Sequence, residues 1–474
     1  MKKFAYAALL TLAAGMIFVP ARAADDDDEK KFTVHGEVRQ RWEYQDNVGD
    51  LTDKIDDGDQ DDEFSFAPYR ARVGVMGQFS NNVSGYISIQ DYGFWGNEFP
   101  LRGEAMPLDQ TDGNIDDSEI DLYQAYIAIN EIGGSKLSLK AGRMELSMGT
   151  ELLIGDNDYY NGQSFDGIVG GWDFEKWDLH FGWLTIEDNN VDNCIDDPFL
   201  DGSSSDCDDD NIDLYGGGAN FEIGDTGQHV EPYIIHYRDG DSGDFGISTS
   251  TIGARWSRGY DDEDQNLLDW SLEALIQTGE IDPNGINKDH SASLIEGTLG
   301  FNFSHGDDAH SRVHVGFLSS SGDDNDTDND NEAFFPLFGD NHSNNRLGNI
   351  DFGGNNALSG LLTWTEDIDE AGEDTGITDI SAGYTFTMGN HMFMAAIHLL
   401  TATEDALAGN GATLANEDDI GQMIDLGYGY RYSQNLSFNV ELSNFMPGDA
   451  FEGLATTDFE DDALRIAGQA RLRW

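Results

Sequence analysis

The chain is poor in cysteine, proline and basic residues: its 474 residues include 2 Cys, 9 Pro and 25 Lys plus Arg. Two cysteines exclude a scaffold held together by many disulfides or by cysteine-rich metal sites. With 91 Asp plus Glu the net charge is -66, which excludes a nucleic-acid-binding protein with a basic face. Beyond the amino terminus no apolar run approaches the roughly 20 residues of a membrane helix, so a helical membrane protein is excluded as well.

The amino-terminal residues form a predicted signal peptide, residues 1–23. A basic start at Met1-Lys2-Lys3 precedes an apolar run from Phe4 to Val19, which is too short to span a bilayer, and then Ala21-Arg22-Ala23. Cleavage after Ala23 would leave a mature chain of residues 24–474. Export implies an oxidising compartment.

The first mature segment, residues 32–44, alternates between apolar and polar side chains. Successive residues of a strand point to opposite faces, so one face would be apolar and the other charged. Its thirteen or so residues are close to the length of a tilted membrane strand and exceed a typical globular strand. The apolar face holds Phe32, Val34, Val38, Trp42 and Tyr44, and the other face holds Thr33, His35, Glu37, Arg39, Arg41 and Glu43.

The same alternation recurs along the chain and predicts about eighteen strands. Mean hydropathy is -0.48, as expected if every second strand residue faces water. The fold class is therefore all-β: an antiparallel transmembrane β-barrel occupying residues 24–474, with no linker that divides it. The other predicted strands are 67–79, 83–92, 119–131, 135–144, 164–174, 177–186, 211–222, 229–238, 247–258, 266–279, 291–304, 310–319, 376–388, 391–403, 420–433, 435–446 and 462–474.

The connections between these strands alternate between long acidic segments and tight turns. Residues 46–65 and 93–118 are long, whereas Ser80-Asn81-Asn82 and Gly389-Asn390 are short. Outer-membrane barrels have long extracellular loops and short periplasmic turns, so an even strand count with both ends in the periplasm is predicted. The aromatic final residue, Trp474, suits recognition by the barrel assembly machinery of the cell outer membrane.

Arginines within the predicted strands are expected to face the lumen, because a charge on the lipid face of a barrel is costly. Guanidinium groups bind carboxylates, so they could form a path for anionic solutes. Alternatively, they could pair with lumenal acids and brace the wall. The arginines expected to line the pore are Arg39, Arg41, Arg70, Arg72 and Arg431.

The loops are strongly acidic, and their Asp and Asn oxygens could bind calcium. The strongest candidate set is Asp324, Asp326, Asp328 and Asp330, although its spacing does not fit an EF-hand loop. Weakly held cations on a solvated acidic surface are the alternative. No other cofactor is predicted.

Both cysteines, Cys194 and Cys207, fall in one acidic loop. In an oxidising compartment we expect one local disulfide between them. A metal site is the weaker alternative, because the other ligands are missing.

Residues 137–172 resemble the alginate export family of outer-membrane porins. The similarity is carried by Gly142-Arg143-x-Glu145-Leu146, Leu153-Ile154-Gly155 and Ser164-Phe165-Asp166-Gly167. Residues 420–451, with Pro447-Gly448-Asp449, are similar to a late hairpin of that family. The resemblance implies an eighteen-stranded monomeric channel for a polyuronate or another solute, with Arg143 facing the pore and Asp166 on the neighbouring strand.

Together these features predict an outer-membrane porin that passes an anionic, alginate-like polysaccharide or small solutes. The alternative is a surface-anchored binding or structural barrel whose acidic loops hold calcium or a partner. An enzyme is not expected, because His35, His180 and His314 are isolated strand residues and no phosphate or zinc motif is present.

Overall fold

The structure is a computed structural model of the chain. It describes residues 31–47, 64–96, 120–174, 176–187, 212–224, 226–239, 245–260, 268–283, 288–306, 308–323, 328–339, 376–404, 407–408, 412–413, 418–449 and 462–474. The predicted signal peptide, residues 1–23, lies outside these residues.

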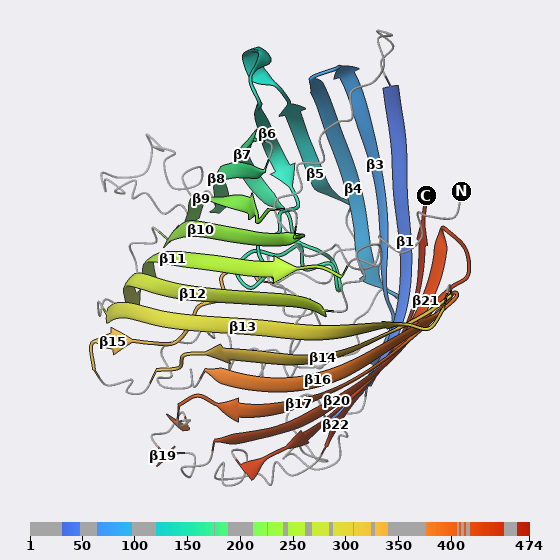
Figure 1. Cartoon of the computed structure of the whole chain (residues 1–474), viewed down its shortest axis with the longest axis vertical. Helices are drawn as coiled ribbons and strands as arrows, with labels where there is room; N and C mark the ends of the chain where they lie inside the picture. Colours follow the sequence, from blue (N-terminus) through green and yellow to red (C-terminus); the bar gives the residue numbers. More distant parts are fainter. Residues whose placement is uncertain are drawn as a thin grey trace, which may run out of the picture.

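Eighteen antiparallel strands form one closed barrel (Figure 1). Each strand alternates between the two faces of the sheet, as the sequence pattern predicts. The barrel strands are β1 (Lys31–Asp46), β3 (Pro68–Ser80), β4 (Val83–Phe94), β5 (Ile120–Ile129), β6 (Leu137–Met144), β7 (Phe165–Asp173), β8 (Trp177–Glu187), β9 (Ile212–Glu222), β10 (Gln228–Asp239), β11 (Phe245–Arg258), β12 (Leu268–Pro283), β13 (Lys288–Ser304), β14 (Ala309–Ser320), β16 (Ile377–Met388), β17 (His391–Ala402), β20 (Asp419–Arg431), β21 (Leu436–Pro447) and β22 (Ala463–Arg473).

Pairing between the first and last strands closes the barrel. Strand β1 pairs with β22 from Glu37 opposite Arg473 to Asp46 opposite Leu464, and its other edge pairs with β3. Closure leaves no free edge, which is what allows a sheet to cross lipid. Four short strands lie outside this ring of pairings: β2 (Phe64–Phe66), β15 (Asp330–Asn331), β18 (Leu407–Ala408) and β19 (Ala412–Thr413).

The predicted strand count is confirmed, and each predicted strand corresponds to an observed one. The largest difference is at the hairpin of β12 and β13, where both strands extend further and Ile281 pairs with Lys288. Alternation continues through these extra residues, so only 284–287 remain as a connection.

Long connections lie mainly at one end of the barrel. The tight turns at 81–82 and 389–390 are at the opposite end, which also holds the start of β1 and the end of β22 and is the end predicted to face the periplasm. The long-short alternation is not complete, because the outer connections at 240–244 and 284–287 are short. These two hairpins continue their pairing almost to the tip.

The outer face of the sheet is apolar. Its side chains are exposed in the isolated protein, for example Ile87, Ile127, Ile252 and Ile276. Near the periplasmic end the rings of Phe174 and Trp177 stack 3.7 Å apart, as in the aromatic belts at lipid–water interfaces. Within the described residues no helix is long and apolar enough to cross a membrane, and the helix described is a 3₁₀ turn at Ile132–Gly134 (η1).

The last residue, Trp474, contacts β1 at the seam, which is the place where the first and last strands pair. Gly36 exchanges two backbone hydrogen bonds of 3.1 Å with Trp474. The Trp474 ring lies over Gly36, so a β-carbon at this position would overlap the ring. Glycine is therefore needed here for close approach.

We expect Gly36→Val to displace the Trp474 ring and to destabilise the barrel by about 1–3 kcal/mol. The heat-induced mobility shift in detergent gels measures this as a lower unfolding temperature. Gly468→Val is the matched control, because a β-carbon at Gly468 meets nothing within 4 Å. Equal stability of both variants would contradict the seam described here.

Candidate functional site

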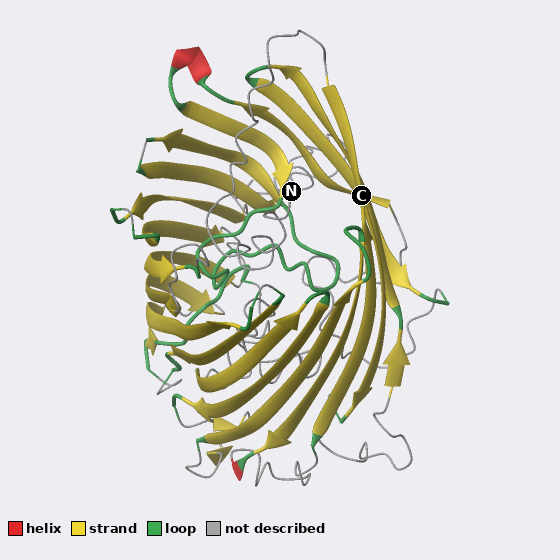
Figure 2. Cartoon of the chain, turned by 45° about the vertical axis from the view of Figure 1, so that its right-hand side comes forward, coloured by secondary structure: helices red, strands yellow, loops and turns green. Residues whose placement is uncertain are grey.

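Residues 145–164, which connect β6 to β7, enter the barrel and cross its interior. Figure 2 shows loop segments inside the ring of strands. The segment, called here the crossing loop, bonds to β1, β3 and β22 at one end and to β11, β12 and β13 at the other. It therefore narrows the lumen where it crosses.

Asp158 holds the crossing loop to the first wall. Its carboxylate oxygens lie 2.6 Å from Arg70 Nη2, 3.0 Å from Arg72 Nη1 and 2.7 Å from Arg471 Nη2. Charge-assisted hydrogen bonds of this length are among the strongest polar contacts in proteins. One loop carboxylate thus joins side chains from β3 and β22.

Backbone carbonyls of the same loop accept further guanidinium hydrogen bonds. Arg39 Nη1 donates to Asp158 O at 2.6 Å, and Arg70 Nη1 donates to Tyr160 O at 3.0 Å. Arg72 Nη2 donates to Asn161 O at 2.6 Å. These bonds fix the backbone of the loop against the wall as well as its side chains.

Tyr159 lies between two arginines. Arg41 and Arg465 both donate hydrogen bonds to its hydroxyl oxygen, and the Arg41 guanidinium lies 4.0 Å from its ring centroid. Such cation–π contacts gain strength when the groups are desolvated. Arg465 also pairs with Glu43 at 3.0 Å, so the loop tyrosine is part of a buried ionic network.

The other end of the crossing loop is bound by acidic residues of the opposite wall. The Thr150 N–H donates to Glu273 Oε2 at 2.7 Å, and the Thr150 hydroxyl donates to Glu296 Oε2 at 2.6 Å. Arg255 Nη1 donates to Gly149 O at 3.2 Å. Attachment at both ends makes the loop a bridge across the lumen.

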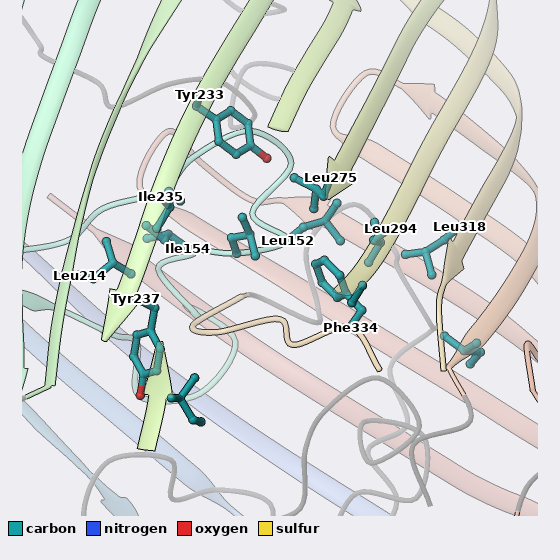
Figure 3. Packing of buried hydrophobic residues seen from close by; sticks show 14 of the residues in the cluster. Leu152, Ile154, Leu214, Tyr233, Ile235, Tyr237, Leu275, Leu294, Leu318 and Phe334 are labelled. Carbon is teal, nitrogen blue, oxygen red and sulfur yellow. The ribbon is translucent and has the colours of Figure 1, made fainter. Parts of the chain in front are cut away.

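A second inward segment, residues 328–339, supports the middle of this bridge. Ile154 and Phe338 form a parallel β-bridge, with Gly155 N donating to Phe338 O at 2.9 Å. Figure 3 shows Leu152, Ile154 and Phe334 pointing toward wall side chains such as Tyr237 and Leu294. Burial of these apolar groups adds to the polar attachments at the ends.

The register of β22, β1 and β3 places arginines directly side by side. Arg39 is opposite Arg471 on one edge of β1 and opposite Arg70 on the other. Like charges in such positions repel one another. Glu37 neutralises part of this charge, with Oε1 2.5 Å from Arg70 Nη2 and Oε2 2.6 Å from Arg471 Nε, and Asp158 neutralises more.

Among the described residues, seven guanidinium groups of the network face five carboxylates, an excess of positive charge. The guanidinium groups belong to Arg39, Arg41, Arg70, Arg72, Arg465, Arg471 and Arg473, and the carboxylates to Glu37, Glu43, Glu145, Asp158 and Glu441. Arg72 and Arg471 keep 13% and 20% of their side-chain surface exposed. This wall, called here the arginine wall, attracts anions.

Burial and ion pairing shift the pKa of the Asp158 carboxyl in opposite directions. Burial raises its pKa, but the coulombic effects of Arg70, Arg72 and Arg39 outweigh burial, so the pKa lies below its ordinary value. The carboxylate is therefore ionised at neutral pH, as its three ion pairs require.

Five of the seven expected pore residues lie on the inner face. Arg39, Arg41 and Arg70 are almost fully buried in the arginine wall, where they bind the crossing loop and lumenal acids. Arg72 is partly exposed beside them, and Arg431 lies exposed at the periplasmic end of β20. The alternative interpretation, in which the arginines pair with lumenal acids and brace the wall, therefore applies to Arg39, Arg41 and Arg70.

The expected pore position of Arg143 and Asp166 is wrong. They pair with each other at 2.7 Å, with 43% and 50% of their side chains exposed. They share a sheet face with Ile127 and Ile168, whose apolar side chains are exposed on the outside of the barrel. This ion pair therefore lies on the outer surface near the start of the crossing loop.

Several residues of the site were not predicted. Asp158, Tyr159 and Tyr160 sit in a connection that carries no strand pattern, and nothing in the sequence indicates that it folds inward. By contrast, the sequence predicts that Arg465 and Arg471, as strand arginines, face the lumen. They lie there beside the arginines of β1 and alternate with the apolar Ile466 and Leu472.

The predicted disulfide and half of the predicted calcium site fall on residues outside the described part. These are Cys194, Cys207, Asp324 and Asp326. Asp328 and Asp330 are described, and Asp330 N donates to Asp328 Oδ1 at 2.8 Å. The described residues contain no group of three or more His, Cys, Asp or Glu arranged to hold a metal ion.

Comparison with known proteins agrees with this architecture. The family model for alginate export matches residues 33–460. This chain belongs to the alginate export family. Its members form channels of the outer membrane, so the closed barrel, apolar outer face and internal loop describe an outer-membrane porin. A search of curated protein sequences finds no match.

Solved structures of outer-membrane proteins share the fold at low sequence identity. OpdK of Pseudomonas aeruginosa with vanillate is 10% identical with a TM-score of 0.53, covering 93% of this chain and 99% of OpdK. OpdL of the same organism is 10% identical with a TM-score of 0.54, covering 94% and 99%. OccAB3 of Acinetobacter baumannii is 9% identical with a TM-score of 0.54, covering 94% and 100%.

We expect Asp158→Asn to weaken the attachment of the crossing loop to the arginine wall by about 3 kcal/mol, because three ion pairs are lost. The loop should then leave the wall part of the time, so single-channel conductance in planar bilayers should rise. Asp166→Asn is the matched control: it removes the same charge on the outer face. An unchanged conductance in Asp158→Asn, or an equal change in Asp166→Asn, would contradict this account.

Proposed function

We propose that this porin passes solutes bearing carboxylates, with alginate-like polyuronates as the first candidate. The proposal rests on the excess of guanidinium groups over carboxylates in the arginine wall. A uronate residue presents a carboxylate, which Arg binds through two parallel N–H donors. Membership of the alginate export family supports this substrate class.

Three arginines of the wall keep exposed surface. Arg473 keeps 58% of its side chain exposed near the periplasmic end of β22, Arg471 keeps 20%, and Arg72 keeps 13% at the crossing loop. At Arg471 and Arg72 an incoming anion would compete with Asp158 for guanidinium donors, because Asp158 already pairs with both.

A small carboxylate is the second candidate. The structural neighbour OpdK was crystallised with vanillate, an aromatic monocarboxylate. The arginine wall would favour it for the same reason, and the crossing loop would restrict long polymers more than small acids. Relative permeability separates the two candidates.

We also propose that the chain acts as a monomer, is exported by its signal peptide and is inserted by the barrel assembly machinery. The sheet closes within one chain through the pairing of β1 with β22. Calcium binding by the acidic loops stays a proposal, and we propose no catalytic role.

The double substitution Arg72→Ser and Arg471→Ser should remove most of the anion preference, because these two cations remain partly exposed on the path. Reversal potentials in a salt gradient measure the preference, and liposome swelling compares galacturonate with uncharged galactose. In the wild type galacturonate should enter faster at low ionic strength, and this advantage should disappear in the variant.

Arg143→Ser is the matched control, since it removes an arginine from the outer face. The proposed function would be wrong if the wild-type channel showed no anion preference, or if the double variant kept the wild-type preference.

A further inference from the structure

Lys140 of β6 is a lumenal cation outside the arginine wall. Its neighbours Leu139 and Ala141 pair with Ile129 and Ile127, which are exposed on the outer face. Because side chains alternate, Lys140 faces the lumen. There it lies opposite the buried Val169 of β7.

The Lys140 ammonium has no anionic partner among the described residues. Its described contact is with the face of the Tyr126 ring, at 4.2 Å from the ring centroid. The guanidinium groups of the arginine wall, in contrast, bind carboxylates or backbone carbonyls. An ammonium beside an aromatic ring in a partly enclosed lumen favours an incoming anion.

The carboxylate of Glu145 interacts electrostatically with Lys140, but the two form no close ion pair. Its Oε1 lies 3.3 Å from Arg72 Nη1 and accepts a hydrogen bond from the Tyr123 hydroxyl. Its Oε2 accepts a hydrogen bond of 2.8 Å from Gln124 Nε2. The acid at the start of the crossing loop is thus already engaged with three other side chains.

Two tyrosines provide flat surfaces next to Lys140. The rings of Tyr86 and Tyr126 lie 5.5 Å apart with 45° between their planes. Tyr86 covers Gly74 of β3, where a β-carbon would overlap its hydroxyl end. Tyr126 is opposite Gly142, which has φ of 125° and approaches the backbone of β5 too closely for any side chain.

The wall on the other side of Lys140 carries small side chains. Val169 is opposite Gly182 of β8, and Gly182 is opposite Gly216 of β9. These residues line a cavity of about 40 Å³ beneath Leu146 and Met148 of the crossing loop, which does not include Lys140. Such a volume holds water but not a six-membered ring, so a ring bound at Lys140 would lie in the lumen against the tyrosines.

The three side chains lie on the periplasmic side of the constriction. On β4, Gln90 pairs with Arg72, whereas Tyr86 is four residues closer to the periplasmic turn at 81–82. Four strand residues correspond to about 13 Å along the wall. A solute from the periplasm would therefore meet Tyr86, Tyr126 and Lys140 before Arg72.

We propose that Lys140, Tyr126 and Tyr86 form a binding subsite for a six-membered ring that carries a carboxylate. The carboxylate binds the Lys140 ammonium and the ring lies against the tyrosines. The inference rests on the proposed function and names a subsite for its solute class. Both a uronic acid residue and an aromatic acid have this chemistry.

The test is block of the single-channel current by trigalacturonate and, separately, by 4-hydroxybenzoate, in wild type and Lys140→Gln. We expect block of the wild type by at least one probe and at least about tenfold weaker block of the variant, as for loss of one hydrogen bond to a charged group. The probe whose block weakens more in Lys140→Gln shows whether the subsite takes a uronic acid residue or an aromatic acid. Galactose trimer, which lacks carboxylates, should block both channels equally weakly.

Two further variants separate the lysine from general effects of charge or folding. Lys136→Gln removes an exposed lysine just before the same strand and should leave block unchanged. Tyr126→Leu should weaken block while Tyr126→Phe retains it, because the ring and not the hydroxyl makes the contact.

Equal block of wild type and Lys140→Gln, an equal effect of Lys136→Gln, or a wild-type channel that neither probe blocks would overturn the subsite. These results are distinguishable from failure of the proposed function, which is measured by reversal potentials and liposome swelling without either blocking probe. If the channel prefers anions but Lys140→Gln does not change block, the proposed arginine path stands and only the proposed subsite is wrong.

Discussion

The arrangement inside the barrel depends on the need of side-by-side guanidinium groups for anionic partners. The register of β22, β1 and β3 aligns Arg471, Arg39 and Arg70 on one inner surface. Desolvated charges of one sign are very unfavourable without counterions. Glu37 comes from the same wall, but Asp158 and the loop carbonyls come from a connection that crosses the lumen. Charge balance in the wall therefore holds one end of the loop in place across the lumen.

Barrel closure brings these residues together from distant parts of the sequence. Arg465 and Arg471 lie near the end of the chain, while Arg39 and Arg41 lie near its start. They become neighbours because β22 pairs with β1. The same seam carries the contact between Gly36 and Trp474 on the outer face. The step that completes the membrane-spanning surface thus also completes the arginine wall.

The fold was largely predictable, because each strand has to satisfy lipid on one face and water on the other. This requirement gave the strand count, most strand ends and the inward direction of Arg39, Arg41, Arg70 and Arg72. The same alternation also places Arg143 correctly on the outer face. Within Leu137–Met144 the inward positions are those of Ser138 and Lys140, so a residue three places after Lys140 faces outward. Resemblance to the family suggested the opposite face.

The crossing loop was not predictable in the same way. Its position depends on partners more than a hundred residues distant, such as Glu296 for Thr150, and on Phe338 for Ile154. Local sequence patterns report the period of a strand, but they do not report which wall a loop will contact. The predicted signal peptide and disulfide lie beyond the described residues.

The most direct test of the account is hydrogen exchange of residues 145–164 in the folded, detergent-solubilised protein. The amides of Thr150 and Gly155 donate to Glu273 and Phe338 inside the barrel. If the loop bridges the lumen, these amides should exchange as slowly as those of the adjoining strands β6 and β7. Exchange within seconds, as in a solvated surface loop, would show that the loop is not held by the wall, and the constriction would have to be abandoned.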